Sequence, residues 1–226
     1  GDLPIIWHIM KRYASYGHDD FYLALGYKAE IIKDYFLNYF NLNSDISIDF
    51  KNKEVSYLNK VKENWKTTLV ETGYASQTGG RLKRLQKYIG EETFMLTYGD
   101  GLSDINFDNL ISFHKKHGRI ATITAVHPTA RFGELLLDDE KVIDFKEKPQ
   151  MNNGWINGGF FIFNKEIFSF LDNDECVLEA SPLENLVKEG ELMAFKHEGF
   201  WQCMDTKRDL IYLNKLWKNN KRFWTQ

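Results

Sequence analysis

The sequence is poor in cysteine, which excludes the protein classes that depend on several cysteines. Cys176 and Cys203 are the only two among 226 residues, and neither belongs to a closely spaced pair of the kind that binds zinc. A fold held together by disulfides needs more cysteines than this. We therefore expect both thiols to be reduced, as in a cytoplasmic enzyme.

Long apolar runs and a large excess of one charge are also missing. No stretch approaches the roughly 18 apolar residues that cross a bilayer, and the first residues lack the pattern of a signal peptide. The formal net charge of −3 gives no overall attraction to nucleic acid or to membranes. We expect a cytoplasmic protein that binds neither nucleic acid nor a membrane.

Apolar residues, in contrast, are plentiful. Hydrophobic types make up 43% of the chain and aromatic types 15%, which is enough for one substantial core. Because no repeat, low-complexity tract or linker interrupts the chain, the sequence predicts a single domain over residues 1–226.

Strand and helix patterns alternate along the first half of the chain. They predict strands at 21–25, 68–70, 93–97 and 120–126, helices at 5–13, 29–40, 79–89 and 107–117, and a hairpin at 46–50 and 55–58. The second half is richer in strands, at 134–137, 141–145 and 156–163, with helices at 165–171, 183–190 and 209–219. This order predicts an α/β fold in three layers, with a mostly parallel sheet and a β-rich extension.

Two aspartates follow strand-like segments. Asp100 stands in Gly99-Asp100-Gly101 directly after the predicted strand at 93–97, at the edge where open α/β sheets bind ligands. Asp205 follows an aromatic-rich segment and precedes the last predicted helix. Two such carboxylates can hold one Mg²⁺ together with phosphate oxygens. The alternatives are an ordinary Asp-Gly turn at Asp100 and a helix N-cap at Asp205.

The tripeptide Glu147-Lys148-Pro149 is a third candidate site. Pro149 restricts Lys148 to an extended backbone, so that the side chains of Glu147 and Lys148 point to opposite sides. The lysine can neutralise a phosphate, and the glutamate can accept hydrogen bonds from sugar hydroxyl groups. The alternative is a charged strand end on the surface.

Two glycine pairs stand where a ligand could approach the backbone. Thr78-Gly79-Gly80-Arg81 opens a predicted helix, where consecutive backbone N–H groups bind anions or a nucleobase. Asn157-Gly158-Gly159 lies inside a strand, and Arg131-Phe132-Gly133 offers a similar point of approach. The alternatives are a flexible loop before a basic helix and ordinary strand-edge geometry.

In this order the motifs resemble the glucose-1-phosphate cytidylyltransferases, a family of the sugar-1-phosphate nucleotidyltransferase superfamily. The resemblance covers essentially the whole chain. It rests on Thr-Gly-Gly-Arg-Leu-Lys-Arg at 78–84, Tyr-Gly-Asp-Gly at 98–101, Arg-Phe-Gly at 131–133, Glu-Lys-Pro at 147–149, Asn-Gly-Gly-Phe-Phe at 157–161, Phe-Trp-Gln at 200–202 and Met-Asp-Thr at 204–206.

The resemblance implies a Rossmann-like three-layer nucleotidyltransferase fold, with a mixed central sheet and a β-rich sugar-binding extension. It implies a reaction in which CTP and α-D-glucose 1-phosphate give CDP-glucose and pyrophosphate, for bacterial surface polysaccharide. It also implies a homo-oligomer as large as a hexamer.

The resemblance further implies roles for individual residues. Asp100, Lys148 and Asp205 would be catalytic, and both aspartates would bind Mg²⁺. The nucleotide would be contacted by Thr78, Gly79, Gly80, Arg81 and Gly99. The sugar phosphate would be contacted by Gly133, Glu147, Lys148, Asn157 and Gly158.

The sequence departs from the family at its beginning. The Gly-Gly-x-Gly-Thr-Arg loop and the Lys-Pro signature, which would precede Gly1, are missing from it. We expect the loop to belong to the natural protein though not to this chain. Because that loop wraps the triphosphate, we expect the chain alone to be weakly active or inactive and the full-length protein, which includes the loop, to be active. Two alternatives stay open: a uridylyl- or thymidylyltransferase that acts on a hexose 1-phosphate, and a catalytically inactive homologue that binds a sugar nucleotide.

Overall fold

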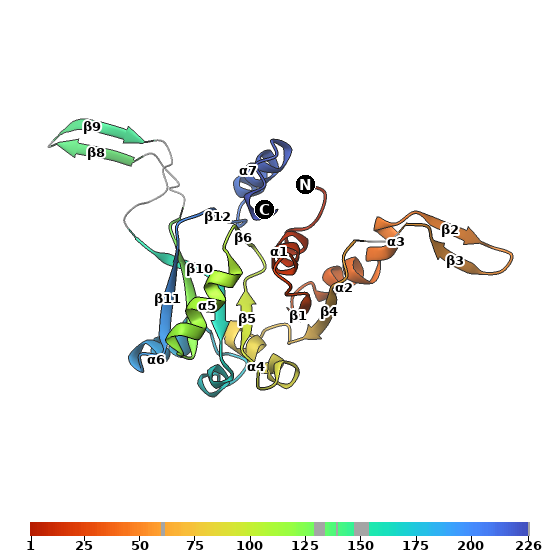
Figure 1. Cartoon of the computed structure of the whole chain (residues 1–226), viewed down its shortest axis with the longest axis horizontal. Helices are drawn as coiled ribbons and strands as arrows, with labels where there is room; N and C mark the ends of the chain where they lie inside the picture. Colours follow the sequence, from red (N-terminus) through yellow and green to blue (C-terminus); the bar gives the residue numbers. More distant parts are fainter. Residues whose placement is uncertain (60–61, 129–133, 139, 147–153, 226) are drawn as a thin grey trace. The chain divides into compact units, whose positions relative to one another are not determined.

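The computed structural model of the chain describes residues 1–59, 62–128, 134–138, 140–146 and 154–225 (Figure 1). These residues form two compact units. The first unit is assembled from residues 1–16, 91–167 and 183–226, and the second from residues 17–90 and 168–182. The single domain expected over 1–226 stays a prediction.

A mixed four-stranded sheet forms the centre of the first unit. Its strand order is β11 (Leu192–His197), β7 (Ala121–Val126), β10 (Ile156–Phe163) and β5 (Phe94–Thr97). Strands β11 and β7 are parallel, whereas β10 runs antiparallel to both of its neighbours. A short antiparallel ladder joins β6 (Gly101–Ser103) to β12 (Trp201–Cys203).

Helices α1 (Ile5–Ala14) and α5 (Phe107–His117) pack on one face of this sheet. Tyr13 of α1 stacks on Phe107 of α5 at 4.1 Å between ring centroids, and both rings contact Phe160 of β10. All three side chains are buried, so they form the core under the site described below. The last helices along the chain are α6 (Ser181–Lys188), α7 (Lys207–Lys218) and the short η2 (Phe223–Thr225), with β11 and β12 between α6 and α7.

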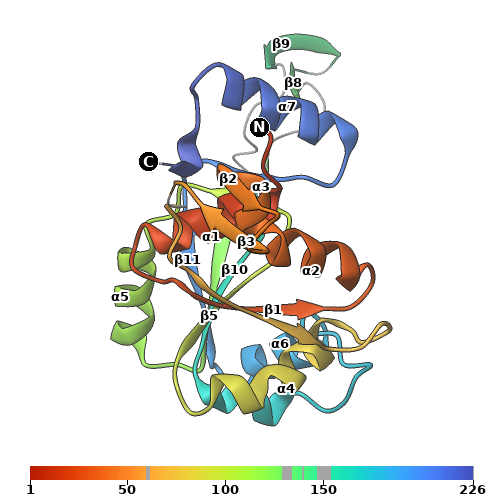
Figure 2. The same cartoon turned by 90° about the vertical axis from the view of Figure 1, so that its right-hand side faces the viewer.

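The second unit is built around two parallel strands, β1 (Asp20–Leu25) and β4 (Lys66–Glu71). Between them the chain forms α2 (Ala29–Leu37), α3 (Tyr39–Asn43) and a hairpin of β2 (Ile46–Asp49) and β3 (Glu54–Tyr57). Helix α4 (Thr78–Ile89) follows and packs beside β1 (Figure 2). The first unit also contains an antiparallel hairpin of β8 (Glu134–Asp138) and β9 (Lys141–Lys146).

The expectation of a mostly parallel sheet is wrong, because β10 runs antiparallel to both of its neighbours in the central sheet. Most predicted elements are confirmed, with two corrections. The helix expected at 29–40 is two helices, because the Asn38 side chain bonds back to Asp34 and the chain leaves helical geometry there. The helix expected at 165–171 is a 3₁₀ helix, η1 (Lys165–Phe170). Strands β6, β11 and β12 were not expected. No helix of the described residues is long and apolar enough to cross a membrane.

Candidate functional site

The ladder between β6 and β12 brings the two predicted metal carboxylates together. Asp100 directly precedes β6, and Asp205 comes shortly after β12. Because Cys203 is paired with Gly101 and the Met204 N–H donates to the Asp100 carbonyl at 2.9 Å, the ends of the two strands are fixed side by side. Asp100 and Asp205 are distant in sequence but adjacent in the first unit.

Negative charge is concentrated where β6 and β12 meet, at Asp100, Cys203 and Asp205, a cluster that we call the metal corner after its predicted role. The pKa of Asp100 is raised, first because its carboxylate is partly removed from water and then because Asp205 lies nearby. The pKa of the Cys203 thiol is raised to about 11, again by burial first and then by Asp205. Its Sγ lies 3.4 Å from the Asp205 carboxylate oxygen Oδ2. A cation placed here would relieve this repulsion.

Asp205 is not the N-cap of the last helix, so that alternative is wrong. Thr206 caps α7: the Asp209 N–H donates to the Thr206 hydroxyl, and the Thr206 N–H donates to the Asp209 carboxylate at 2.9 Å. The carboxylate of Asp205 therefore does not cap the N-terminus of α7 and is available to a ligand.

The donor set of this corner fits Mg²⁺. Magnesium is commonly held by one or two carboxylates, and phosphate oxygens and water complete its octahedral shell. Within the described part of the chain, no lysine or arginine forms an ion pair with Asp100 or Asp205. Among the same residues no cluster of three or more His, Cys, Asp or Glu forms a closed metal site. An ion here would keep most of its shell for substrate oxygens.

The glycine pair of β10 forms a bulge next to this corner. Between Asn157 and Phe161 the pairing of β10 with β7 shifts register. Gly158 has no room for a side chain, since a Cβ would lie 2.7 Å from Val126. Gly159 has a φ of +75°, and a Cβ there would lie 2.5 Å from the Tyr98 ring. Packing thus accounts for both glycines.

The Asn157 amide holds the bulge in place. Its Oδ1 accepts a hydrogen bond from the Gly159 N–H at 2.8 Å, and its Nδ2 donates to the Tyr98 hydroxyl at 3.1 Å. Asn157 thus retains one N–H and one lone pair for a substrate. Tyr98 is a residue to which the sequence assigned no role, although it directly precedes Gly99-Asp100.

The predicted nucleotide segment opens α4 in the second unit. A loop at 173–179, which we call the α4 clamp, packs against it. A Cβ on Gly79 would lie 2.7 Å from the Cys176 Sγ, and a Cβ on Gly80 would lie 2.5 Å from the Asp174 carbonyl oxygen. These glycines are therefore required by the close approach of the clamp, whatever else they contact.

The clamp also uses backbone donors that the sequence left free for a ligand. The N–H groups of Gln77 and Gly80 donate to the carbonyls of Asp174 and Cys176 at 2.8 and 3.1 Å. The Thr78 hydroxyl donates to Glu179 at 2.6 Å. The cradle of consecutive N–H groups is thus shorter than expected, because only the N–H groups of Thr78 and Gly79 take no part in these bonds.

Arg81 is anchored to the ends of β1 and β4. Its guanidinium donates to the Thr72 hydroxyl at 2.9 Å and to the carbonyls of Gly73 and Leu25 at 3.0 and 3.2 Å. None of these acceptors is a carboxylate, so these hydrogen bonds place no negative charge against the guanidinium. A hollow of about 760 Å³ lies between the segment that leads into α4 and the α4 clamp. It is lined by Gly73, Tyr74, Ala75, Ser76, Gln77, Arg84, Asp174, Glu175 and Val177.

Three predicted sugar-phosphate residues, Gly133, Glu147 and Lys148, lie outside the described residues.

A serine, a histidine and an aspartate also lie together, but they do not form a site for nucleophilic catalysis by the serine. Ser103, His197 and Asp104 lie close together, with His197 Nε2 at 3.2 Å from the serine hydroxyl and 2.9 Å from the aspartate. Ser103 is only 4% exposed and donates to the Phe200 carbonyl at 2.8 Å, so it cannot attack a substrate.

Known proteins resemble this chain over nearly its whole length. A model of the nucleotidyl transferase family matches residues 1–219. The glucose-1-phosphate cytidylyltransferase of Salmonella typhi is 47% identical over 225 residues, which are 99% of this chain and 88% of that protein. A probable glucose-1-phosphate cytidylyltransferase of Bacillus subtilis is 44% identical with the same coverage.

Solved structures share the fold at low sequence identity. A putative glucose-1-phosphate thymidylyltransferase from Bacillus anthracis, 16% identical, superposes with a TM-score of 0.68 over 96% of this chain and 83% of its own. The HddC protein of Yersinia pseudotuberculosis, 22% identical, gives 0.66 over 96% and 91%. The predicted α/β nucleotidyltransferase fold with a mixed sheet is thereby confirmed.

Proposed function

We propose, since the chain belongs to the nucleotidyl transferase family, that it transfers a cytidylyl group from CTP to α-D-glucose 1-phosphate. The products are CDP-glucose and pyrophosphate. The choice of cytidine and glucose is supported by the two relatives of 44% and 47% identity named for that reaction. We further propose that the reaction takes place in the cytoplasm and supplies a sugar nucleotide for surface polysaccharide.

The observation that carries the proposal is the carboxylate pair of Asp100 and Asp205. Both would hold a Mg²⁺, which when bound offsets phosphate charge during transfer. A phosphate oxygen of the sugar phosphate attacks the α-phosphorus of CTP, and the bond from that phosphorus to the β-phosphate oxygen breaks. Because the attacking oxygen is already ionised, the chain needs no general base.

The remaining residues would position the two substrates. The free N–H groups of Thr78 and Gly79, the Arg81 cation and the open backbone at Gly99 would contact the nucleotide. Asn157 and Gly158 would contact the sugar, together with Gly133 and Glu147. Lys148 would reduce the repulsion between the two anionic substrates and hold the attacking phosphate in line.

Pyrophosphate release tests the proposal. The full-length protein, given CTP, glucose 1-phosphate and Mg²⁺, should release pyrophosphate and form CDP-glucose, and chelation of the metal should stop both. Asp100→Asn and Asp205→Asn should each lower kcat by at least about 100-fold. Asp108→Asn, a matched change at an exposed aspartate of α5, should not. Near-normal turnover in Asp100→Asn would contradict the metal assignment.

The nearest rival is a transferase for a different nucleotide. A comparison of kcat/KM for CTP, UTP and dTTP with glucose 1-phosphate decides this point, and a preference for UTP or dTTP would overturn the cytidylyl assignment. An inactive binding homologue would instead bind CDP-glucose in calorimetry without turnover of any of the three.

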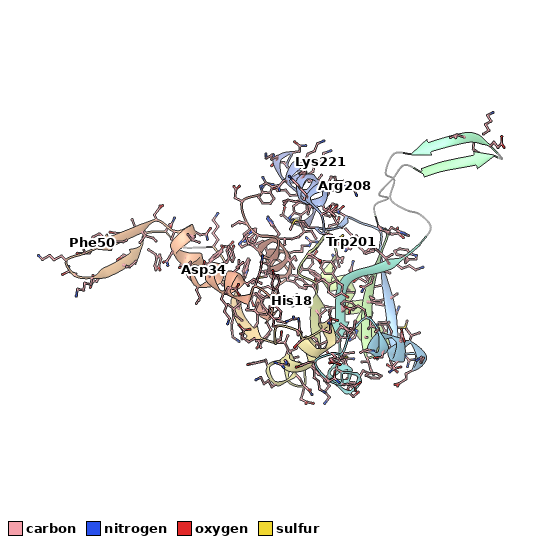
Figure 3. The ribbon with its side chains drawn as sticks, turned by 180° about the vertical axis from the view of Figure 1, so that it is seen from behind. His18, Asp34, Phe50, Trp201, Arg208 and Lys221 are labelled. Carbon is pink, nitrogen blue, oxygen red and sulfur yellow. The ribbon has the colours of Figure 1, made fainter. Side chains whose placement is uncertain are left out.

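We also propose that the protein assembles from several copies through the β2–β3 hairpin. Its residues alternate strictly: Ile46 and Ile48 share one face with their cross-strand partners Tyr57 and Val55, and the other face is polar. Ile48, Val55 and Tyr57 are 50–57% exposed, and Phe50 at the turn is 86% exposed (Figure 3). An isolated two-stranded hairpin is marginally stable, so a covered apolar face supports an oligomer.

A further inference from the structure

Trp201 links the metal corner to the glycine bulge of β10. It begins β12, the strand that leads to Asp205, and it is labelled in Figure 3. The indole N–H donates to the carbonyl oxygen of Gly158 at 2.8 Å. The ring lies beside Gly101, where an added Cβ would be in ordinary contact with the indole nitrogen, at 3.8 Å.

The bulge explains why this hydrogen bond is needed. Where the register of β10 shifts, backbone groups at Gly158 and Gly159 lose their regular ladder partners. Gly159 recovers both of its bonds, since its N–H donates to the Asn157 side chain and its carbonyl accepts from the Tyr98 N–H at 3.0 Å. The Gly158 carbonyl is satisfied by Trp201. A buried carbonyl without a partner is costly, so the indole stabilises this backbone shape.

We propose that Trp201 is a positioning residue that sets the distance between the sugar-contacting bulge and the metal carboxylates. One strand, β12, carries both the indole that fixes Gly158 and the turn that presents Asp205. Loss of the N–H would let the bulge relax and shift the Asn157 amide away from Asp100 and Asp205. The proposal rests on the function above, in which Asn157 and Gly158 contact the sugar.

The predicted consequence is selective for one substrate. The bulge belongs to the proposed sugar contacts, whereas the proposed nucleotide contacts lie on other segments, at Thr78–Arg81 of α4 and at Gly99 between β5 and β6. Loss of the N–H should therefore raise KM for glucose 1-phosphate by about five- to tenfold, the size expected for one buried hydrogen bond. KM for CTP should change by less than about twofold. A purely structural residue would change both KM values, or neither.

The test uses the full-length protein and two replacements of Trp201. Trp201→Phe keeps an aromatic ring and removes the donor. Site-specific incorporation of 3-benzothienylalanine keeps the shape of the indole and removes only the N–H, so it remains informative if the phenylalanine variant folds poorly. The matched control is Trp224→Phe, since Trp224 is a second tryptophan of the first unit whose N–H donates to His8 Nδ1 at 3.4 Å and not to the bulge.

We expect both Trp201 variants to show the selective rise in KM for glucose 1-phosphate, and Trp224→Phe to keep both KM values. An unchanged KM for glucose 1-phosphate in the benzothienyl variant would overturn the proposal, as would equal changes for both substrates. If the unaltered protein shows no turnover with CTP and glucose 1-phosphate, the proposed function fails and the role of Trp201 fails with it. If the unaltered protein turns over normally and the Trp201 variants lack the selective rise in KM, only the proposed role of Trp201 fails and the proposed function stands.

Discussion

At Asp100 a carboxylate stands beside a second carboxylate, and no lysine or arginine of the described residues forms an ion pair with it. A raised pKa means that the folded state binds a proton at Asp100 more tightly than the unfolded chain does. The carboxylate therefore opposes folding at neutral pH, and this effect disappears as the pH falls through the raised pKa. A loss of stability of this kind is typical of residues that are kept for ligand binding, the role proposed for Asp100.

Removing this charge should stabilise the metal-free protein. Asp100→Asn relieves the repulsion with Asp205, so the metal-free variant should have a Tm higher than that of the unaltered protein by up to about 4 °C. Because solvent screens the two charges, we expect a rise in Tm well below this maximum. Adding Mg²⁺ should raise the Tm of the unaltered protein more than that of the variant. Thermal scans with and without Mg²⁺ measure this, and a lower Tm in metal-free Asp100→Asn would contradict the repulsion.

A second residue gives a stability change in mild acid. His8 is buried among aromatic rings, and burial lowers its pKa to about 4, while its Nδ1 accepts from Trp224. The pKa of histidine in the unfolded chain is about 6.5. The unfolded chain therefore binds a proton at His8 more readily than the folded protein does, so the free energy of unfolding is highest above pH 6.5 and decreases as the pH falls from 6.5 toward 4. At pH 5 the loss amounts to about 2 kcal/mol.

Urea unfolding at pH 7.5 and at pH 5 checks this prediction. The unaltered protein should lose about 2 kcal/mol more than His8→Phe between these two pH values. His18→Gln, at a partly exposed histidine, should behave like the unaltered protein. An equal loss in the protein and in His8→Phe would mean that another group is responsible.

The glycines of the site separate into two kinds. Gly99 has open space where a Cβ would be, whereas Gly159 has a positive φ and a Cβ would meet the Tyr98 ring. Gly99→Ala should therefore keep the Tm of the protein, and a rise in its KM for CTP would support the predicted nucleotide contact. Gly159→Ala should be destabilised by about 1–3 kcal/mol. Equal stability of the two variants would contradict this distinction.

Among the elements, α4 depends on a loop far away in sequence. The clamp at 173–179 accepts backbone bonds from the first turn of α4 and pairs Asp174 with Arg84. Gly80→Ala would push a methyl group into the backbone at Asp174, so we expect a loss of about 1–3 kcal/mol in unfolding free energy. Arg84→Met removes an exposed ion pair and should cost less than about 1 kcal/mol. Chemical denaturation of both variants measures the difference, and the reverse order would contradict it.

The sequence predicted elements well where periodicity runs over many residues. The amphipathic spacing of α1, α4 and α5 and the apolar runs of β5, β7 and β10 gave their positions to within a few residues. It failed for β6 and β12, which are only three residues long and show no period. These short strands nevertheless bring Asp100 and Asp205 together.

The site itself was predicted in part. Asp100 and Asp205 were predicted from their places after strand-like segments and from family resemblance, and the structure brings the two residues together, while their metal role stays a prediction. The sequence could not show why glycine is required at positions 79 and 80. The space that a side chain would need there is occupied by Cys176 and Asp174, which are far away along the chain. Trp201 had no assigned role for the same reason. Its partner, Gly158, is defined by folding and not by spacing along the chain.

For the whole molecule, the amphipathic hairpin predicts association. A variant with Ile48→Ser and Val55→Ser should elute as a smaller species in size-exclusion chromatography, while circular dichroism stays unchanged, because these side chains are largely exposed within the chain. Glu54→Gln, on the polar face of the same hairpin, should elute like the unaltered protein. An unaltered protein that elutes as a monomer would remove the basis for this interface.

The first unit is assembled from three stretches of chain, and this has a kinetic consequence. Asp100 stands in the middle stretch and Asp205 in the last, so their meeting closes a very long loop. Contacts of such separation form late, after the local helices and neighbouring strands. Mg²⁺ should therefore slow unfolding and leave the refolding rate almost unchanged. The ability to bind the ion would then mark the moment at which the chain has finished folding.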